Sequence, residues 1–354
     1  MKKNLLYLLA LICTLNFFTA CSDDDDDDKP GKETWEQLTK EYSGDALTVN
    51  GGAKGKVDVK ATSATAALIT LESVVPEAKN IKIDATLATT KSYATAATAT
   101  PIYTLAGDAT VNDTKIAVTG TFDNKGSLTL NVTRTLPESI AKSWKLSYIP
   151  TATAIIPVVY TDVATGDAAT DAQLNAMIPA VIGGLMAGKV KAVTADLKSN
   201  GSFEVEWTNV TGETNKLSEL EIYGGIKLGA FVELQYAVID SKFYLTINKK
   251  LFVDPVLAPM LEAFLLSKGI ELETLLKLMT DLGGYYGFPL NFKQDGDNTT
   301  FYLNKEQLDQ ILVIAKPFMG SIENENLAQM LAQVELLLKA PTTTKFDFGL
   351  TFNK

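Results

Sequence analysis

Two glutamates in a short run are the residues of this chain best spaced for catalysis. Glu204 and Glu206 stand two residues apart in the run 203–207, Phe-Glu-Val-Glu-Trp. A β-strand would hold them on one face, about 6.6 Å apart at about 3.3 Å per residue. Glycosidase carboxylates lie about 5–9.5 Å apart, so a carboxylate-only glycoside hydrolase is one hypothesis. We favour a simpler interpretation, in which the apolar residues of the run face a core and both glutamates face water.

The residue types that are missing restrict the chemistry further. The chain contains no histidine, which excludes Ser-His-Asp and Cys-His nucleophile systems, His-ligated metal sites and imidazole proton transfer. Its two cysteines, Cys13 and Cys21, both precede the globular sequence, so the folded part has no disulfide and no thiol nucleophile. We therefore predict no catalytic residues, no metal site and no cofactor.

One short segment has oxygen-rich side chains of the kind that bind calcium. Residues 295–298, Asp-Gly-Asp-Asn, cluster such side chains, but the twelve-residue ligand spacing of a calcium loop is missing. Asp or Asn beside Gly is typical of tight hairpins. We predict a hairpin turn here.

Aromatic residues are a less specific indication of a binding site than catalytic or metal-binding residues. Trp207, Tyr223, Tyr285 and Tyr286 could present flat faces to a sugar ring or an apolar ligand. Packing between a sheet and its helices is the alternative for each of them. Tyr285 and Tyr286 follow a Gly-Gly turn and are adjacent, so they cannot both face one core.

Residues 1–20 have the features of a secretory signal peptide. Two lysines precede a nearly continuous apolar run at 5–18, which is shorter than the ~20 residues of a membrane-spanning helix. Residues 18–21, Phe-Thr-Ala-Cys, resemble a bacterial lipoprotein cleavage box, which implies lipid attachment to Cys21. The alternative is an ordinary secretory signal with an incidental cysteine.

An acidic tract follows the cysteine. It consists of Ser22, Asp23, Asp24, Asp25, Asp26, Asp27 and Asp28. Adjacent like charges repel one another, so we expect residues 21–34 to form a solvated tether. The tract resembles the export signal of Bacteroides-type lipoproteins, which implies an outer-membrane, lipid-anchored protein exposed on the cell surface. If the tract is only a spacer, the anchor faces the periplasm.

Composition limits the partners. The chain has 46% hydrophobic and 21% charged residues, a globular composition. It has 32 Lys plus Arg against 42 Asp plus Glu, a net charge of −10, and so lacks the basic surface that nucleic-acid binding needs. Nucleic acid is not an expected partner.

Residues 35–138 are expected to form an all-β domain. Alternation of apolar and polar residues predicts strands at 56–60, 81–84, 115–119 and 127–132, within a total of around seven or eight strands. Gly107-Asp108 is one of the predicted turns between strands. A sandwich or a small closed barrel is predicted.

Residues 139–354 are expected to form a second, α+β domain, with an antiparallel sheet and several helices. Apolar residues at helical spacing occur at 171–187, 256–266, 272–282, 305–316 and 325–340. Pro179 and Gly183-Gly184 should kink or shorten the first helix, and Pro317 should stop the fourth. Residues 344–352 alternate and are predicted to be a final strand that closes the sheet.

The N-terminal unit resembles a known type of domain. It begins Tyr42-Ser43-Gly44-Asp45 and has Gly120-Thr121-Phe122-Asp123 before a closing strand, as in the calycin-like domains of Bacteroides lipoproteins. The chain is similar in length and layout to an uncharacterised surface-lipoprotein family of those bacteria. The resemblance implies a calycin-like β-domain and brings no catalytic residues. The Gly-x-Trp start of lipocalins is missing, so no lipocalin-type cavity is implied.

These observations favour a non-catalytic protein that binds a ligand at the cell surface. The expected ligand is a glycan or a lipid-like small molecule, bound in or beside the second domain. A structural or protein–protein interaction component of the cell envelope is the alternative, and the carboxylate-only hydrolase comes third. A glycan or lipid that raises the melting temperature would support the first hypothesis, and crosslinked partners from membranes would support the second.

Overall fold

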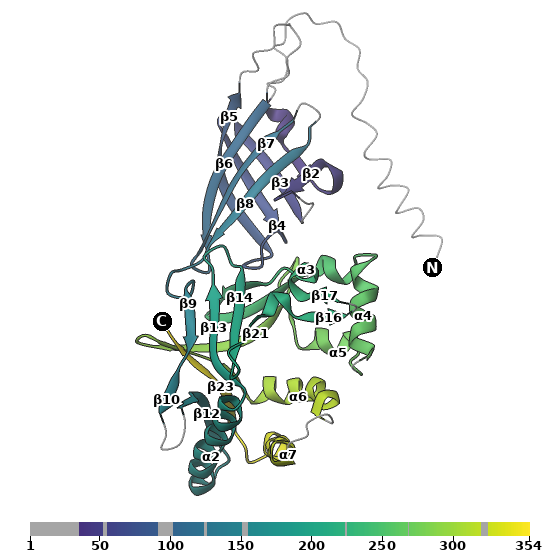
Figure 1. Ribbon diagram of the computed structural model, residues 1–354. Coiled ribbons are helices and arrows are strands. Elements are labelled where there is room, and N and C mark those ends of the chain that lie inside the picture. The colour runs from purple at the N-terminus through teal and green to yellow at the C-terminus, as the bar shows by residue number, and fades with distance from the viewer. Residues whose placement is uncertain are drawn as a thin grey trace, which may run out of the picture.

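The computed structural model describes residues 35–51, 55–90, 102–123, 126–150, 155–223, 225–267, 269–319 and 325–354. Two curved, mainly antiparallel sheets follow one another along the chain (Figure 1). The first, drawn in purple and blue, is a nearly closed barrel, and the second has helices packed around it. The fold is therefore α+β, as the sequence predicted.

The first sheet has eight strands in the order β1-β3-β4-β5-β6-β7-β8-β2. They are β1 (Lys40–Tyr42), β2 (Leu47–Val49), β3 (Lys56–Ser63), β4 (Ala66–Glu72), β5 (Asn80–Thr90), β6 (Ile102–Val111), β7 (Thr114–Phe122) and β8 (Leu128–Thr135). The four strand segments predicted from alternation match β3, β5, β7 and β8, although the last begins at Leu128 rather than at residue 127. The 3-10 helices η1 (Glu36–Leu38) and η2 (Gly44–Ala46) flank β1.

One N-terminal segment closes the barrel. Its first half, β1, pairs antiparallel with β3, and its second half, β2, pairs parallel with β8. Asn50 continues the second pairing with its side chain, because Nδ2 donates to the Val132 carbonyl at 2.9 Å and Oδ1 accepts from the Val132 N–H at 2.8 Å. Asn50 thus acts as one more strand residue at the point where the backbone turns away.

Replacing Asn50 with glycine is expected to lower the free energy of unfolding by about 1–3 kcal/mol, because both Val132 groups lose a partner. Glycine retains the backbone conformation, since Asn50 has a φ of 49° that glycine adopts freely. Chemical denaturation measures the effect. Asn131→Ala, at an exposed position next to Val132, is the control and should change stability little. Equal effects of the two substitutions would contradict this account of the closure.

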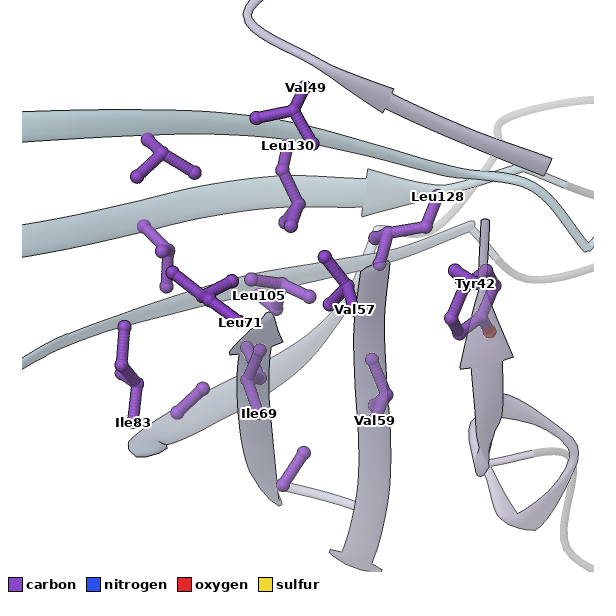
Figure 2. Packing of buried hydrophobic residues seen from close by; sticks show 14 of the residues in the cluster. Tyr42, Val49, Val57, Val59, Ile69, Leu71, Ile83, Leu105, Leu128 and Leu130 are labelled. Carbon is purple, nitrogen blue, oxygen red and sulfur yellow. The ribbon is translucent and has the colours of Figure 1, made fainter. Parts of the chain in front are cut away.

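The barrel interior is a packed core rather than a cavity. Its strands turn alternate apolar residues inward, and these side chains interdigitate along the axis (Figure 2). Val57, Val59, Ile69, Ile83 and Ile116 are each fully buried. The interior of this barrel is therefore filled by the protein's own side chains.

The predicted turn at Gly107-Asp108 is wrong. Both residues lie inside β6, and the turn occurs instead at Asn112-Asp113, where φ is 48° and 60°. Gly107 is needed for close packing, because a Cβ there would lie 2.5 Å from the Asp84 carbonyl oxygen. The positive φ angles of a tight hairpin are instead supplied by Asn and Asp.

The second sheet has the path β15-β14-β13-β9-β23-β22-β21-β19-β18, with β12 added beside β23 and β20 beside β21. Its strands are β9 (Ser143–Leu146), β12 (Val159–Ala164), β13 (Val190–Leu197), β14 (Phe203–Asn209), β15 (Thr214–Lys216), β18 (Gln235–Ile239), β19 (Lys242–Asn248), β20 (Thr280–Asp281), β21 (Tyr285–Asp295), β22 (Asn298–Leu303) and β23 (Lys345–Asn353). Two short ribbons lie outside it, β10 (Tyr148–Pro150) with β11 (Ile155–Pro157) and β16 (Glu221–Tyr223) with β17 (Ile226–Lys227). The predicted final strand is real, but β23 lies in the middle of the sheet between β9 and β22.

The second sheet curls until β18, at one edge, meets the chain just before β14, next to the other edge. Ser202, at the start of β14, forms a bridge with Gln235 at the edge of β18. Two backbone hydrogen bonds join the same places, from Tyr236 N to Gly201 O at 2.8 Å and from Phe203 N to Leu234 O at 3.2 Å. One end of this second, incomplete cylinder is therefore closed.

The helices are α2 (Ala168–Ala187), α3 (Leu228–Phe231), α4 (Leu257–Ser267), α5 (Leu272–Lys277), α6 (Lys305–Met319) and α7 (Glu325–Lys339), with the 3-10 helices η3 (Leu217–Glu219) and η4 (Lys249–Phe252). Asn304 and Gln307 form a capping box at the start of α6, with reciprocal hydrogen bonds of 2.9 and 3.0 Å. The helix predicted at 272–282 ends early, because residues 280–281 pair with β21 as β20.

Two prolines do not end or shorten their helices. α6 continues past Pro317 to Met319, and α2 runs through Pro179 for 20 residues. Proline at 179 removes the donor for the Asn175 carbonyl, and the Thr161 hydroxyl, 3.4 Å away, donates to that carbonyl instead. The Asn175 side chain in turn bonds both backbone groups of Val163, which protects the β12 edge.

Candidate functional site

The second sheet encloses an apolar hollow of about 360 Å³. Its walls come from residues of six strands and from η3. They are Ala195 and Leu197 of β13, Phe203 and Val205 of β14, Phe243 and Leu245 of β19, Leu290 of β21, Tyr302 and the flanking Phe301 and Leu303 of β22, the residues 348–350 and Phe352 of β23, and Leu217 of η3.

Strand alternation explains why the hollow is apolar. Residues two apart on a strand point to the same side of the sheet, so each strand contributes its apolar set to the concave face. The closed end is filled by a buried cluster that includes Trp144, Tyr236 and Phe352. Farther along, Val205, Leu245 and Leu290 are only half-buried, because nothing in the described part of the chain covers them completely.

The hollow suits an apolar ligand better than a sugar. Its volume falls within the roughly 300–1,000 Å³ of small-molecule sites. None of the residues that line it is charged, and Tyr302, the lining residue with a polar side chain, packs its ring against Tyr160 instead. A glycan would lose hydrogen bonds to water on entering, which costs free energy unless polar partners replace them.

The two adjacent tyrosines point in different directions, as predicted. Tyr285 is buried, and its hydroxyl donates to the Val74 carbonyl of the barrel at 3.3 Å. Burial raises the pKa of Tyr285 to about 12. Tyr286 is half-buried, packs edge-on against Phe252 at 5.3 Å, and carries the Lys249 ammonium 4.6 Å from its ring centre. Tyr285 thus joins the two sheets and offers no accessible face, which makes it unsuitable as a ligand platform.

The other two aromatic candidates do not complete a site with them. Trp207 lies half-buried on β14, opposite Val193 and Asn215. The backbone of Tyr223 belongs to β16, while its side chain lies outside the described residues. Trp207, Tyr285 and Tyr286 do not line the hollow.

The two glutamates of β14 have different surroundings. Glu204 Oε1 accepts hydrogen bonds from the N–H groups of Val205 and Ser218, at 3.0 and 3.1 Å, and so ties η3 to the sheet. Glu206 is exposed. Glu204 therefore has a structural task, and the pair does not face a common pocket.

The remaining sequence predictions concern the lipidation site, the acidic tract and the Asp-Gly-Asp-Asn segment at 295–298. Cys21 and the tract Ser22–Asp28 lie outside the described residues. Residues 295–298 form the turn between β21 and β22, as predicted, with Gly296 at a φ of 60°. Within the described ranges, no group of His, Cys, Asp and Glu is placed to hold a metal ion.

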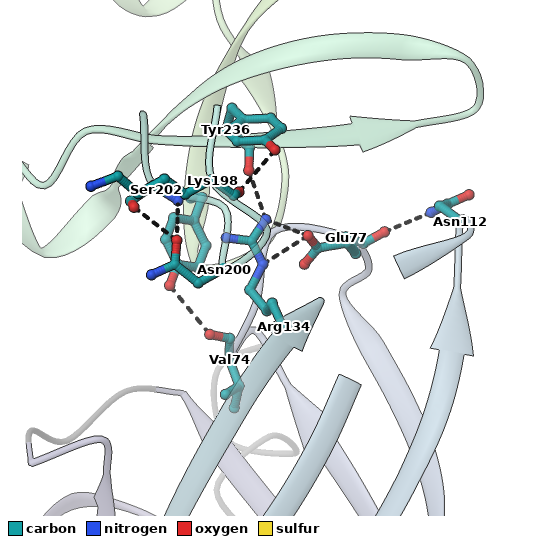
Figure 3. Close-up of polar contacts among 9 residues, drawn as sticks. Val74, Glu77, Asn112, Arg134, Lys198, Asn200, Ser202 and Tyr236 are labelled. Carbon is teal, nitrogen blue, oxygen red and sulfur yellow. Dashed lines mark hydrogen bonds and ion pairs between the residues drawn. The ribbon is translucent and has the colours of Figure 1, made fainter. Parts of the chain in front are cut away.

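Arg134 and Glu77 form a buried ion pair within the barrel, and a further hydrogen bond from Arg134 reaches the second sheet (Figure 3). Arg134, at the end of β8, donates from Nε to Glu77 Oε1 at 2.8 Å and from Nη2 to the Tyr236 carbonyl at 2.7 Å. Side-chain exposure is 7% for Arg134 and 0% for Glu77. Gly201 makes room for the guanidinium, because a Cβ there would lie 2.2 Å from Arg134 Nη1.

Comparisons with protein-family models, with curated proteins and with solved structures found no match for this chain. Among the described residues, no helix combines the length and the apolar character that crossing a bilayer requires. Function is therefore inferred from the geometry of the chain itself.

Proposed function

We propose that this protein is a non-catalytic, surface-exposed lipoprotein that binds a lipid-like small molecule in the hollow of its second sheet. The observation that carries this proposal is the uncharged, apolar lining of the hollow. The proposal includes lipid attachment at Cys21 and export directed by the acidic tract. Both are supported by the resemblance of residues 18–28 to a lipoprotein cleavage box and export signal. The nearly closed barrel supports a calycin-like N-terminal domain of the uncharacterised Bacteroides type.

Between the two ligand classes predicted from the sequence, the lining favours the lipid-like one. Each methylene of an alkyl chain that is buried contributes about 0.8 kcal/mol to binding. An alkyl chain has no polar group that would need a hydrogen-bond partner in the hollow. The filled barrel leaves the second sheet as the place where such a molecule fits.

Replacing Ala195 with phenylalanine is expected to weaken binding of decanol, an uncharged alkyl probe, by about tenfold or more. The added ring would occupy the hollow and exclude several methylenes of the probe, at about 0.8 kcal/mol each. Ala195 is half-buried and faces the hollow. Displacement of a fluorescent apolar dye by decanol measures the affinity.

Ala192→Phe is the matched control, because Ala192 lies on the same strand but is exposed. It should leave decanol binding unchanged. The proposal fails if the native protein binds neither the dye nor decanol, or if both variants bind decanol as the native protein does.

One observation favours the alternative of a protein-binding component of the envelope. Val256, just before α4, is 64% exposed, and Leu266 within α4 is 58% exposed; exposed apolar side chains that gather into a patch mark protein interaction sites. A crosslinked envelope partner on this helix, combined with an empty hollow, would favour this function over ligand binding.

A further inference from the structure

A second, chemically different cavity lies where the barrel meets the second sheet. It has a volume of about 490 Å³, within the roughly 300–1,000 Å³ typical of ligand sites, which often lie at such junctions. The barrel contributes residues 73 and 76–79, from the connection between β4 and β5. The second sheet contributes Lys249, residues 281–283 and Ile239. We call this cavity the junction cleft.

The lining of the junction cleft carries two lysines and two carboxylates, but one of the lysines is unpaired. Asp281 Oδ1 accepts a hydrogen bond from Lys249 Nζ at 2.5 Å, and Glu77 is paired with Arg134. Lys79 is exposed at the rim, and within the described part of the chain its ammonium group has no ion-pair partner. Because Arg134, which lies outside the lining, neutralises Glu77, Lys79 is the charged lining residue left without an ion-pair partner among the described residues.

The neutralising groups are fixed in place. Lys249 Nζ lies 4.6 Å from the centre of the Tyr286 ring, a cation–π contact that limits its movement. Hydrogen bonds from Lys249 and from the Gly283 N–H lower the pKa of Asp281 below its usual value, so this carboxylate is ionised. Because Oδ1 accepts both of these bonds, Oδ2 offers its lone pairs to a hydroxyl group of a ligand.

We propose that the junction cleft binds a small, hydroxylated organic anion, such as a sugar acid, at a site separate from the apolar hollow. Lys79 meets the carboxylate of the ligand, and Asp281 and Ser73 accept hydrogen bonds from its hydroxyl groups. The volume of the junction cleft and its unpaired lysine suit a monoanion of monosaccharide size. Tyr286 acts here through Lys249 rather than by contact with the ligand.

Calorimetric titration of the native protein with glucuronate tests this proposal, with glucose and acetate as matched probes. Glucuronate is expected to bind, and each of the other two at least about tenfold more weakly, because glucose lacks the charge and acetate lacks the hydroxyls. Lys79→Gln should weaken glucuronate binding about tenfold or more. Lys82→Gln removes an exposed lysine from β5 outside the junction cleft and should leave binding unchanged.

Three outcomes would overturn the proposal: no binding of glucuronate, equal binding of glucose or acetate, or equal losses from Lys79→Gln and Lys82→Gln. The Ala195→Phe variant separates this site from the hollow. It should bind glucuronate as the native protein does, and Lys79→Gln should bind decanol normally. Either site can therefore fail its test while the other passes.

Discussion

Replacing Arg134 with methionine is expected to lower the free energy of unfolding by about 3–5 kcal/mol, since breaking a buried ion pair leaves an unpaired charge. The Glu77 side chain has no exposed surface and would keep its carboxylate without a counter-ion. The Tyr236 carbonyl would also lose its donor. Chemical denaturation monitored by tryptophan fluorescence measures the change.

The double variant Arg134→Met/Glu77→Met is the control for this prediction. Apolar replacement of both partners of a buried pair is often neutral or stabilising, so the double variant should recover most of the loss. The single and double variants together give the coupling energy of the pair. A single variant within about 1 kcal/mol of the native protein would contradict the role of this pair at the junction.

Replacing Gly349 with alanine is expected to lower the free energy of unfolding by about 3 kcal/mol, the upper part of the range for overpacking. Gly349 lies in β23 between Tyr160 of β12 and Tyr302 of β22, and the two tyrosine rings meet beside it at 5.4 Å. A Cβ on residue 349 would lie 2.0 Å from the Phe301 carbonyl oxygen. Backbone atoms in a central strand cannot move aside without disturbing the hydrogen bonds to the neighbouring strands.

Gly184→Ala is the matched control, and its effect should have the opposite sign. Gly184 lies in α2 with open space around its Cβ position, and alanine is preferred to glycine in a helix by roughly 0.5–1 kcal/mol. Thermal unfolding of both variants measures the contrast. If Gly349→Ala is as stable as Gly184→Ala, the packing described for the centre of the sheet is wrong.

Local patterns in the sequence predicted local structure well. Alternation located β3, β5, β7 and β8, because burial on one face of a strand imposes a period of two. The capping pair Asn304 and Gln307 is equally local, since both partners lie within one helical turn. The errors came from contacts with distant segments. Pro179 was predicted to disturb α2, but Thr161 of another element replaces the lost donor.

The binding sites could not be predicted from the sequence, because their parts are far apart along the chain. The hollow combines Ala195 with Phe352, and the junction cleft combines Lys79 with Asp281. Tyr285 was a reasonable ligand-binding candidate until the structure placed its hydroxyl on Val74, 211 residues away. The apolar strand residues were evident, but which of them remain half-covered depends on how far the second sheet curls.

The most direct test of ligand binding in the hollow is an NMR measurement of contacts between ¹³C-labelled decanol and the protein's methyl groups. We expect cross-relaxation between the alkyl chain and the methyl groups of Leu245, Leu290 and Leu350, all of which line the hollow. Contacts confined to other surfaces, such as Leu266 of α4, or no saturable contacts at all, would contradict the account.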